Sequence, residues 1–378
     1  MSERTGIRLV EHFSALDDPR IDRSKEHLLI DIVTIAICAV ICGADDWVEV
    51  AAVGRGKEEW FRQFLELPNG IPSHDTFWRV FRALDPMQFE ACFLAWVREV
   101  MRLTDGEIVA IDGKKLRRSY DRTSHKAAIH MVSAWATTNH LVLGQRKVNE
   151  KSNEIKAIPE LLRLLEIHGC VVTVDAIGCQ KEVAEAIRTQ GADYALAVKQ
   201  NQGKLYEDVK DLFAGAVEEQ WRDVHHGYVR DVCGDHGRIE IRECWTISDG
   251  DFLDYLRNRQ AWKDLKTIVM LRCERRVGRK RSRQTRYYIS SLPNDAKRIL
   301  KVVRGHWGIE NGLHWILDIA FQEDHSRLRK GHGAHNFAML RHIALNLLKQ
   351  EKTEQIGVKA KRLRAAVDNR YLLRVLTS

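Results

Sequence analysis

The chain has 378 residues, of which 44% are hydrophobic and 30% charged, a composition typical of globular proteins with two or three domains. Its formal net charge is +8, yet 12 Lys and Arg stand against 3 Asp and Glu between His325 and Ser378, and 8 against 1 between Arg272 and Arg286. Together these two segments carry more positive charge than the whole chain, so the remainder is net acidic. Positive charge gathered in patches indicates a protein that binds nucleic acid.

The sequence also argues against several classes of protein. The longest mainly apolar run, Ile32–Ile41, has ten residues, which is too short to span a bilayer and too far from the N-terminus for a signal peptide. The eight cysteines form no Cys-x-x-Cys pairs, so reduced thiols are expected rather than a disulfide framework or a zinc site. We therefore expect a cytoplasmic protein without a membrane partner.

The N-terminal part of the chain is predicted to be helical. Leu28–Cys42 is apolar almost all round, which is typical of a buried central helix. Glu58–Leu67 is amphipathic, and a second helix at Ser73–Leu84 can be capped by its serine. Two helices joined by a short turn, with Arg79 and Arg82 exposed, permit a helix-turn-helix that reads DNA. An ordinary helical bundle is an equally good interpretation.

The next feature is a short apolar run, Ile108–Ile111, which predicts a buried strand and is closed by Asp112. A carboxylate at the end of a buried strand is costly unless a cation, a metal or a hydrogen-bond donor meets it. Lys114, Lys115 and Arg117 place positive charge beside this carboxylate, which suits a polyanion. The alternative is a plain strand-ending turn, because Asp-Gly is a common turn pair.

Strands and helices then alternate in a way that predicts a mixed sheet with helices on its faces. A second buried strand, Cys170–Val174, also ends in an aspartate, Asp175. The other expected elements are strands at Ala127–Thr137, Leu141–Val148 and Tyr194–Val198, and helices at Asn153–Ile167, Lys181–Gln190 and Leu205–Phe213.

From about Trp221 to Leu292 the pattern changes to alternating polar and apolar residues, which predicts a β-rich insertion. Three segments have the character of strands, and the intervening Glu274–Arg283 is expected to form a basic hairpin tip. The strand segments are Arg238–Thr246, Thr267–Cys273 and Thr285–Ser290.

A helical segment follows Pro293, and its residues Glu310, His314 and Asp318 fall four apart, roughly on one face. Each glycine within a helix costs about 1 kcal/mol relative to alanine, so several glycines indicate that DNA or the sheet edge comes close to the backbone. These glycines are Gly305, Gly308 and Gly312.

The two strand-ending aspartates suggest a metal site. If their strands are parallel neighbours, Asp112 and Asp175 meet at the edge where open α/β sheets bind ligands. Two carboxylates there repel unless a divalent cation joins them, and oxygen ligands suit Mg²⁺ or Mn²⁺. A third acid on a nearby helix completes a site for two ions that supports phosphodiester displacement. Glu310 is the candidate, in competition with Asp318, Glu323 and Asp324.

Five blocks of the sequence resemble bacterial insertion-sequence transposases of the H-repeat-associated type, members of the DDE superfamily with an RNase H-like core. They are IDGKKLRRS, EKSNEIKAIPELL, TVDAIGCQ, AVKQNQG and RGHWGIENGLHWILDIAFQEDHSRLR. The resemblance implies Asp112, Asp175 and Glu310 as the acidic triad, holding Mg²⁺ or Mn²⁺ as two ions. We expect DNA contacts from Lys114, Lys115, Arg117, Lys199, Asn201, Gln202, Arg304, His306, Trp307 and Asn311.

One departure from related transposases concerns hairpin formation. Many hairpin-forming relatives carry Tyr-x2-Arg-x3-Glu-x6-Lys around the last acid, whereas Val303, His306, Glu310 and Leu317 stand here. Hairpin formation on the DNA end is therefore not carried over. His306 can still contact a phosphate and Trp307 can stack on an unpaired base, although packing in the core is an equally good interpretation of both.

The expected protein is a bacterial, nucleoid-associated DNA transposase that hydrolyses phosphodiester bonds and transfers strands at insertion-sequence ends, as a homodimer on double-stranded DNA. Alternatives are an RNase H-like nuclease without strand transfer and an inactive, domesticated DNA-binding protein. The basic C-terminus (Lys359, Lys361, Arg362, Arg364) and the Arg272–Arg286 hairpin are expected to supply most non-specific DNA affinity. The expected division is a helical domain at 1–100, the catalytic core at 101–215 and 293–350, the β-rich insertion at 216–292, and a basic tail at 351–378.

Overall fold

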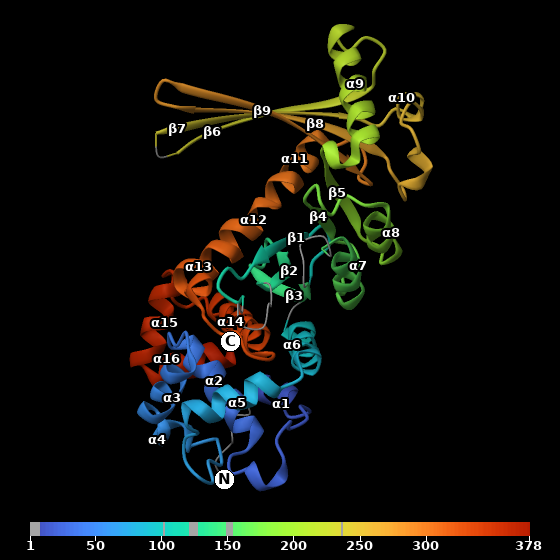
Figure 1. Ribbon diagram of the computed structural model, residues 1–378. Helices are drawn as coiled ribbons and strands as arrows, with labels where there is room; N and C mark the ends of the chain where they lie inside the picture. Colours follow the sequence, from blue (N-terminus) through green and yellow to red (C-terminus); the bar gives the residue numbers. More distant parts are fainter. Residues whose placement is uncertain (1–7, 101–102, 121–127, 149–153, 236) are drawn as a thin grey trace.

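The computed structural model describes residues 8–100, 103–120, 128–148, 154–235 and 237–378. Its main feature is a nine-stranded mixed sheet with the order β3-β2-β1-β4-β5-β9-β8-β7-β6. One end of this sheet lies beside a helical body that contains helices from both ends of the chain, and the other end extends away as long ribbons (Figure 1).

The five strands nearest the helical body form an RNase H-like core. Strand β1 pairs antiparallel with β2 and parallel with β4, and β4 pairs parallel with β5. The sequence-based prediction of a three-stranded meander followed by α/β crossovers is therefore confirmed, as is the parallel pairing of the two strands that lead to the aspartates. The first strand does not end at Asp112, however, because its pairing with β2 continues to Lys115. The strands are β1 (Ile108–Lys115), β2 (His130–Ala136), β3 (Leu141–Val148), β4 (Val171–Val174) and β5 (Asp193–Val198).

Helices cover both faces of this core sheet. On one face, apolar side chains from three helices join those of the strands in one cluster; the helices are α7 (Glu154–Leu164), α8 (Lys181–Thr189) and α9 (Gly203–Glu218). The other face is covered by α11 (Ala296–Gly305), α12 (Trp307–Ile309) and α14 (Gly333–Gln350). This three-layer arrangement buries the strands on both sides, which explains their continuous apolar sequences.

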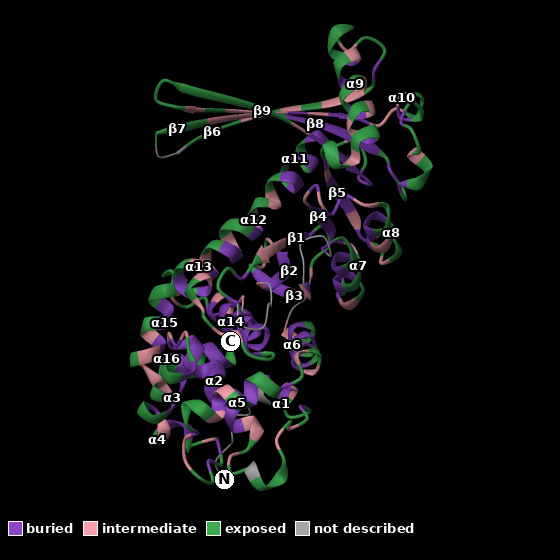
Figure 2. Ribbon diagram, viewed as in Figure 1, coloured by how far each residue is buried: buried purple, intermediate pink, exposed green. Residues whose placement is uncertain are grey.

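The predicted β-rich insertion continues the core sheet through the antiparallel pairing of β5 with β9. Its hairpin tip is much shorter than Glu274–Arg283, because the pairing of β8 with β9 runs out to Val277 and Lys280. The basic residues of this segment therefore lie along a paired ribbon, largely exposed (Figure 2). The strands are β6 (His226–Asp235), β7 (Arg238–Ile247), β8 (Thr267–Val277) and β9 (Lys280–Ser290), with α10 (Gly250–Asp254) between β7 and β8.

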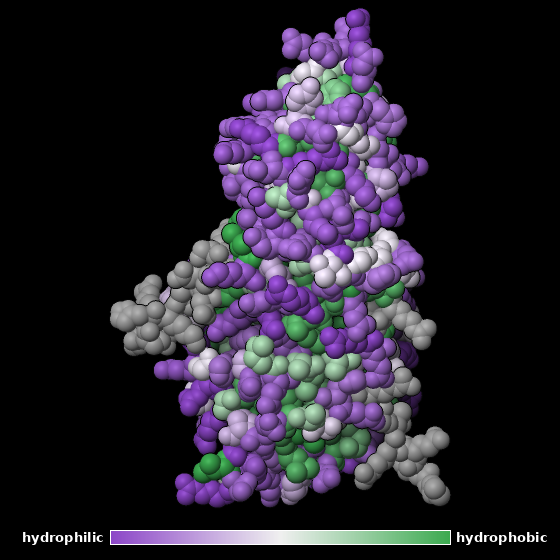
Figure 3. All heavy atoms as spheres, turned by 90° about the vertical axis from the view of Figure 1, so that its right-hand side faces the viewer, coloured by the Kyte–Doolittle hydropathy of each residue, from purple (hydrophilic) through white to green (hydrophobic). Residues whose placement is uncertain are grey.

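The helical body has one hydrophobic core, shared by the N-terminal helices, α14 and the C-terminal helices. The prediction of a central buried helix is confirmed by α2 (Leu29–Ile41), whose residues from Asp31 to Ile41 are all buried. The surrounding helices are α1 (Arg8–Phe13), α3 (Trp47–Gly56), α4 (Glu58–Phe61), α5 (His74–Ala83), α6 (Pro86–Val100), α15 (Val358–Val367) and α16 (Asn369–Thr377). On the face turned to the viewer in Figure 3, apolar side chains gather in the lower half of the picture, where the helical body lies. The upper half of that face is mainly hydrophilic.

Of the two helices predicted at Glu58–Leu67 and Ser73–Leu84, one is confirmed and the other is wrong in length. Helix α5 forms as expected, with the Ser73 hydroxyl accepting a hydrogen bond from the Thr76 N–H. The other helix is wrong in length, because α4 ends at Phe61. Leu67 has a positive φ of 44°, and its N–H donates to the buried Asp31 carboxylate, so the chain turns towards α2 instead of continuing as a helix. DNA reading by this pair stays a prediction.

The basic C-terminus is folded, and this corrects part of the expected DNA contact. Arg362 donates to the carbonyl of Val40 at 2.9 Å and to that of Ala320, and Lys361 donates to the carbonyl of Leu348 at 3.0 Å. The last carbonyls of a helix have no partner within the helix, so buried cations can satisfy them. These two cations therefore stabilise the ends of neighbouring helices and are not available to DNA. Within the described residues, no helix is long and apolar enough to cross a membrane.

Candidate active site

Asp112 lies near the C-terminal end of β1, opposite Ser133 of β2. Its Oδ1 accepts a hydrogen bond of 2.8 Å from the N–H of Gly113, and its side chain is 28% exposed. The pKa of Asp112 is raised to about 6, mainly by burial and also by the nearby carboxylates of Asp175 and Glu154, against the opposing effect of His314. At this site the carboxylate therefore binds a proton more readily than an exposed aspartate does, and a bound cation would stabilise its ionised form.

Asp175 follows directly on β4, and the parallel register pairs Ile111 with Val174. Asp112 and Asp175 are consequently the next residues on neighbouring strands, which is the placement that the sequence predicted. The Oδ1 atom of Asp175 accepts hydrogen bonds from the N–H groups of Ile177 (3.1 Å) and Gly178 (3.3 Å). These bonds fix the carboxylate at the start of the loop beyond the strand.

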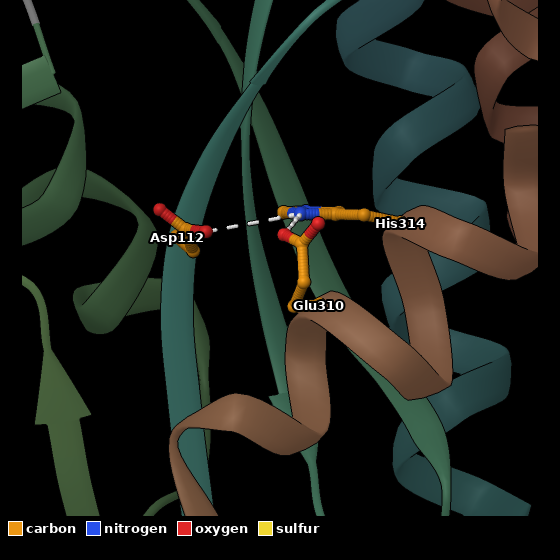
Figure 4. A group of neighbouring side chains, drawn as sticks. All are labelled: Asp112, Glu310 and His314. Carbon is orange, nitrogen blue, oxygen red and sulfur yellow. Dashed lines mark hydrogen bonds and ion pairs between the residues drawn. The ribbon is translucent and has the colours of Figure 1, made fainter. Parts of the chain in front are cut away.

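Glu310 and His314 approach Asp112 from a helix on the other side of the site (Figure 4). His314 Nδ1 lies 3.4 Å from Glu310 Oε2 and 3.7 Å from Asp112 Oδ2. The hydrogen bond with His314 lowers the pKa of Glu310. The segment between α12 and α13 (Trp315–Ala320) is a π-helical turn, η5 (Glu310–His314), and such turns are frequent at functional sites.

Within the described residues, Asp112, Glu310 and His314 form a group that could hold a metal ion, with ligand atoms all within 4.8 Å of one another. Asp175 is adjacent to this group but is not a member of it. Carboxylate oxygens fit Mg²⁺ or Mn²⁺, so the donor set suits the expected cation. The sequence placed His314 on the face of Glu310 by its spacing of four but gave it no role, and that spacing is the signal by which it could have been found.

The helix reaches the sheet because glycines face it. A Cβ atom at Gly312 would lie 2.8 Å from the Trp135 ring, and one at Gly305 would lie 2.9 Å from Ile108. The predicted close approach is therefore confirmed, and what approaches these glycines is the sheet. Closer packing of the helix on β1 and β2 brings Glu310 to Asp112.

The competitors of Glu310 are engaged elsewhere. Lys114 donates to the carboxylates of Asp318 and Glu323, the latter at 2.8 Å. Asp324 lies 3.1 Å from Arg117 Nε. The Lys114 side chain is only 12% exposed, so the expected contact of Lys114 with DNA is wrong. Its ammonium group already has two carboxylate partners inside the protein.

The AVKQNQG segment, which begins at the end of β5, supports the loop beside Asp175. The side-chain amide of Asn201 donates to the carbonyl of Ala176, and that of Gln202 donates to the carbonyl of Cys179 at 2.9 Å. Both amides therefore hold the loop that follows Asp175, a role that the sequence did not reveal. Their contact with DNA stays a prediction, as does that of the exposed Lys199 and of the other expected contacts at the surface, Lys115 and Arg117.

His306 and Trp307 are neighbours with different surroundings. His306 Nδ1 lies 3.1 Å from Thr173 Oγ1 of β4, and burial lowers the pKa of His306. Trp307 is 49% exposed, and the Arg286 guanidinium lies over its ring, 4.9 Å from the centroid. The core interpretation therefore fits His306, whereas Trp307 is at the surface.

Trp307 lies in a concave surface of about 820 Å³ between the ribbon of β7–β9 and the helices α11 and α12. We call this surface the arginine groove. Asn311, the residue after Glu310, is part of its lining, so the groove comes close to the carboxylate site. Its arginines are Arg238, Arg242, Arg275, Arg283, Arg286 and Arg304.

Comparison with known proteins adds an independent line of information. A family model described as "Transposase DDE domain" matches residues 102–347, and a second, associated with it, matches residues 10–97. The chain is 40% identical over 372 residues to the "H repeat-associated putative transposase YhhI" of Escherichia coli strain K12, covering 98% of this chain and 97% of the relative. It is 41% identical over 375 residues to the "Putative transposase YncI" of Escherichia coli O157:H7, covering 98% and 94%. A cryo-EM structure of a piggyBac transposase synaptic complex with hairpin DNA aligns with a TM-score of 0.42 and 11% identity, covering 98% of this chain and 78% of that one.

Proposed function

Because the chain belongs to the family of DDE transposases, we propose that it hydrolyses phosphodiester bonds at insertion-sequence ends and joins the resulting 3′-hydroxyl groups to target DNA. The observation that carries this proposal is the convergence of Asp112 and Glu310 on one site, from β1 and from a distant helix. Asp175 joins them as the third acid, from the strand parallel to β1.

In this proposal Asp112, Asp175 and Glu310 hold two Mg²⁺ or Mn²⁺ ions. When bound, such ions activate the attacking oxygen and stabilise the leaving oxygen of an in-line displacement. His314 orients the Glu310 carboxylate through the contact of 3.4 Å between them. Glu310 is 59% exposed, whereas His314 is 6% exposed, so the carboxylate faces the side from which DNA would enter.

The proposal is tested with a duplex that carries an element end, incubated with purified protein and Mg²⁺, and analysed for nicked and joined products. Joined products support transposition. Nicks without joining would indicate a nuclease on the same site, and DNA binding without either product would indicate an inactive protein. Two copies acting on paired ends are also part of the proposal, and light scattering with and without end DNA measures that assembly.

The exposed arginines and the lysine at the tip of the β8–β9 hairpin are proposed to bind duplex phosphates. Replacing Arg275, Arg279, Lys280 and Arg281 with alanine should flatten the dependence of log K on log salt by about 0.9 for each phosphate that the variant no longer neutralises. Fluorescence anisotropy with labelled duplex at several salt concentrations measures this slope. A matched control removes four exposed lysines, two within α9 and two just before β8, which should leave the slope unchanged: Lys204, Lys210, Lys263 and Lys266. Equal slopes in the two variants would contradict a role for the ribbon.

Trp307 is proposed to stack on an unpaired base at the cleaved end. Trp307→Ala should weaken binding of a single-stranded oligonucleotide by about 1–3 kcal/mol, the usual contribution of one base–aromatic contact. Trp307→Phe, which keeps a ring, should retain most of this affinity. Titration with the oligonucleotide measures both variants. A loss of thermal stability in Trp307→Ala with unchanged affinity would show instead that the ring serves packing.

A further inference from the structure

A buried ionic cluster lies beside the carboxylate site. Lys114 of β1 donates to Asp318 of α13 and to Glu323, which lies just beyond α13. The side chains of Lys114 and Glu323 are 12% and 2% exposed, and Arg341 Nη1 of α14 lies 3.9 Å from Glu323 Oε1. Ion pairs so far removed from water are screened little by salt, and breaking one leaves an uncompensated charge.

The cluster forms a second contact between the two elements that carry the site. Lys114 lies two residues after Asp112 on β1, and Asp318 lies four residues after His314 on the helix. Two residues of a strand advance about 6.6 Å, and four residues of a helix advance about 6 Å. The contact between Asp112 and His314 and the contact between Lys114 and Asp318 are therefore successive steps along the same pair of elements.

Apolar packing also holds this helix, because Ile309, Leu313 and Leu317 are buried in the hydrophobic core. Gly308 and Gly312 face the sheet, where their backbone lies against Thr137 and Trp135. These glycines let the helix backbone pack closely on the sheet, but they contribute no side chain that makes a polar contact with it. The π-helical turn at Glu310–His314 also departs from regular winding at this position. Apolar contacts have little directionality, whereas the ion pair of Lys114 with Asp318 joins one defined position of β1 to one defined position of the helix.

We propose that Lys114 is a positioning residue, which fixes the helix that carries Glu310 against β1 and so holds Glu310 and His314 opposite Asp112. This inference rests on the proposed function, because it concerns the same carboxylate site. It assigns Lys114 a role through Asp318 and Glu323 rather than through contact with DNA. The ammonium group acts on the site by holding two elements together.

The test measures how tightly full-length Lys114→Met protein binds Mn²⁺. The electron paramagnetic resonance signal of unbound Mn²⁺ reports the binding during a titration. We expect affinity to fall by about tenfold, within the 10–100-fold range for residues that orient metal ligands, while affinity for duplex DNA stays unchanged. Lys115→Met is the matched control, since Lys115 is the exposed neighbour on the same strand, and its Mn²⁺ affinity should equal that of the wild type. Unchanged Mn²⁺ affinity in Lys114→Met would overturn the inference.

Without Lys114, the buried negative charge of Glu323 has only Arg341 as a positive neighbour among the described residues, so Lys114→Met can fail to fold. The double variant Lys114→Met with Glu323→Gln removes both charges, and should fold while still binding Mn²⁺ weakly. Recovery of wild-type Mn²⁺ affinity in the double variant would reduce Lys114 to a stabilising role and overturn the proposal.

If the wild type itself binds no Mn²⁺, the proposed function fails, and hydrogen exchange without metal still tests the positioning. Exchange at 310–320 should increase in the double variant. Unchanged exchange there would overturn the inference separately from the function.

Discussion

Asp112→Asn and Asp175→Asn are each expected to abolish metal-dependent cleavage, by about 10³-fold or more, while duplex DNA binding stays nearly intact. Asparagine keeps the shape of the side chain and the oxygen that accepts the N–H of Gly113, or those of Ile177 and Gly178. It removes the charge that holds a divalent cation. Cleavage of an end duplex in Mg²⁺ and in Mn²⁺, with anisotropy for DNA binding, measures the two effects.

The control for these variants is thermal unfolding at neutral pH. Burial raises the pKa of Asp112, so at pH 7 its ionised form opposes folding of the metal-free protein. Asp112→Asn should therefore unfold at the same temperature as the metal-free wild type or at a higher one. Normal Mg²⁺-dependent cleavage by a folded Asp112→Asn or Asp175→Asn protein would remove that residue from the site.

The two aspartates could be predicted because their signal is local. Each ends a short apolar run, and the order of strands and helices is enough to make those runs parallel neighbours. Glu310 was harder to assign, since its helix also carries Asp318 and since the group that could hold a metal ion depends on contacts across about 200 residues of sequence. The glycines predicted that DNA or the sheet edge comes close to this helix, and the structure shows that the sheet does so at Gly305 and Gly312.

The buried cations could not be predicted, for a physical reason. A charge pattern gives the number and the spacing of basic residues, but whether a cation meets DNA or an internal acceptor depends on residues far away in the sequence. Lys114 and Lys115 are adjacent, yet the alternation of a strand sends the first towards Asp318 and leaves the second exposed. Arg362 likewise reaches Val40, 322 residues away. For these residues, local sequence carries no signal of burial.

The substitution Glu310→Gln tests whether Glu310 is the third acid, and its expected effect on strand transfer is large. Glu310 lies 3.4 Å from His314, which in turn lies 3.7 Å from Asp112, and its carboxylate is exposed. Asp318 instead accepts a hydrogen bond from Lys114, and its side chain is 30% exposed. We expect Glu310→Gln to eliminate strand transfer, because glutamine keeps the side-chain volume but lacks the charge needed to hold a cation.

Asp318→Asn should reduce strand transfer and leave measurable activity, because Lys114 keeps its second partner, Glu323, at 2.8 Å and the helix keeps most of its position. Both variants are compared at equal folded concentration, with an end duplex, target DNA and Mn²⁺. A common loss would indicate that Asp318 positions the helix more strongly than its exposure suggests. If strand transfer survives in Glu310→Gln and vanishes in Asp318→Asn, the third acid must be reassigned to Asp318, and Lys114 would then neutralise a catalytic carboxylate rather than position one.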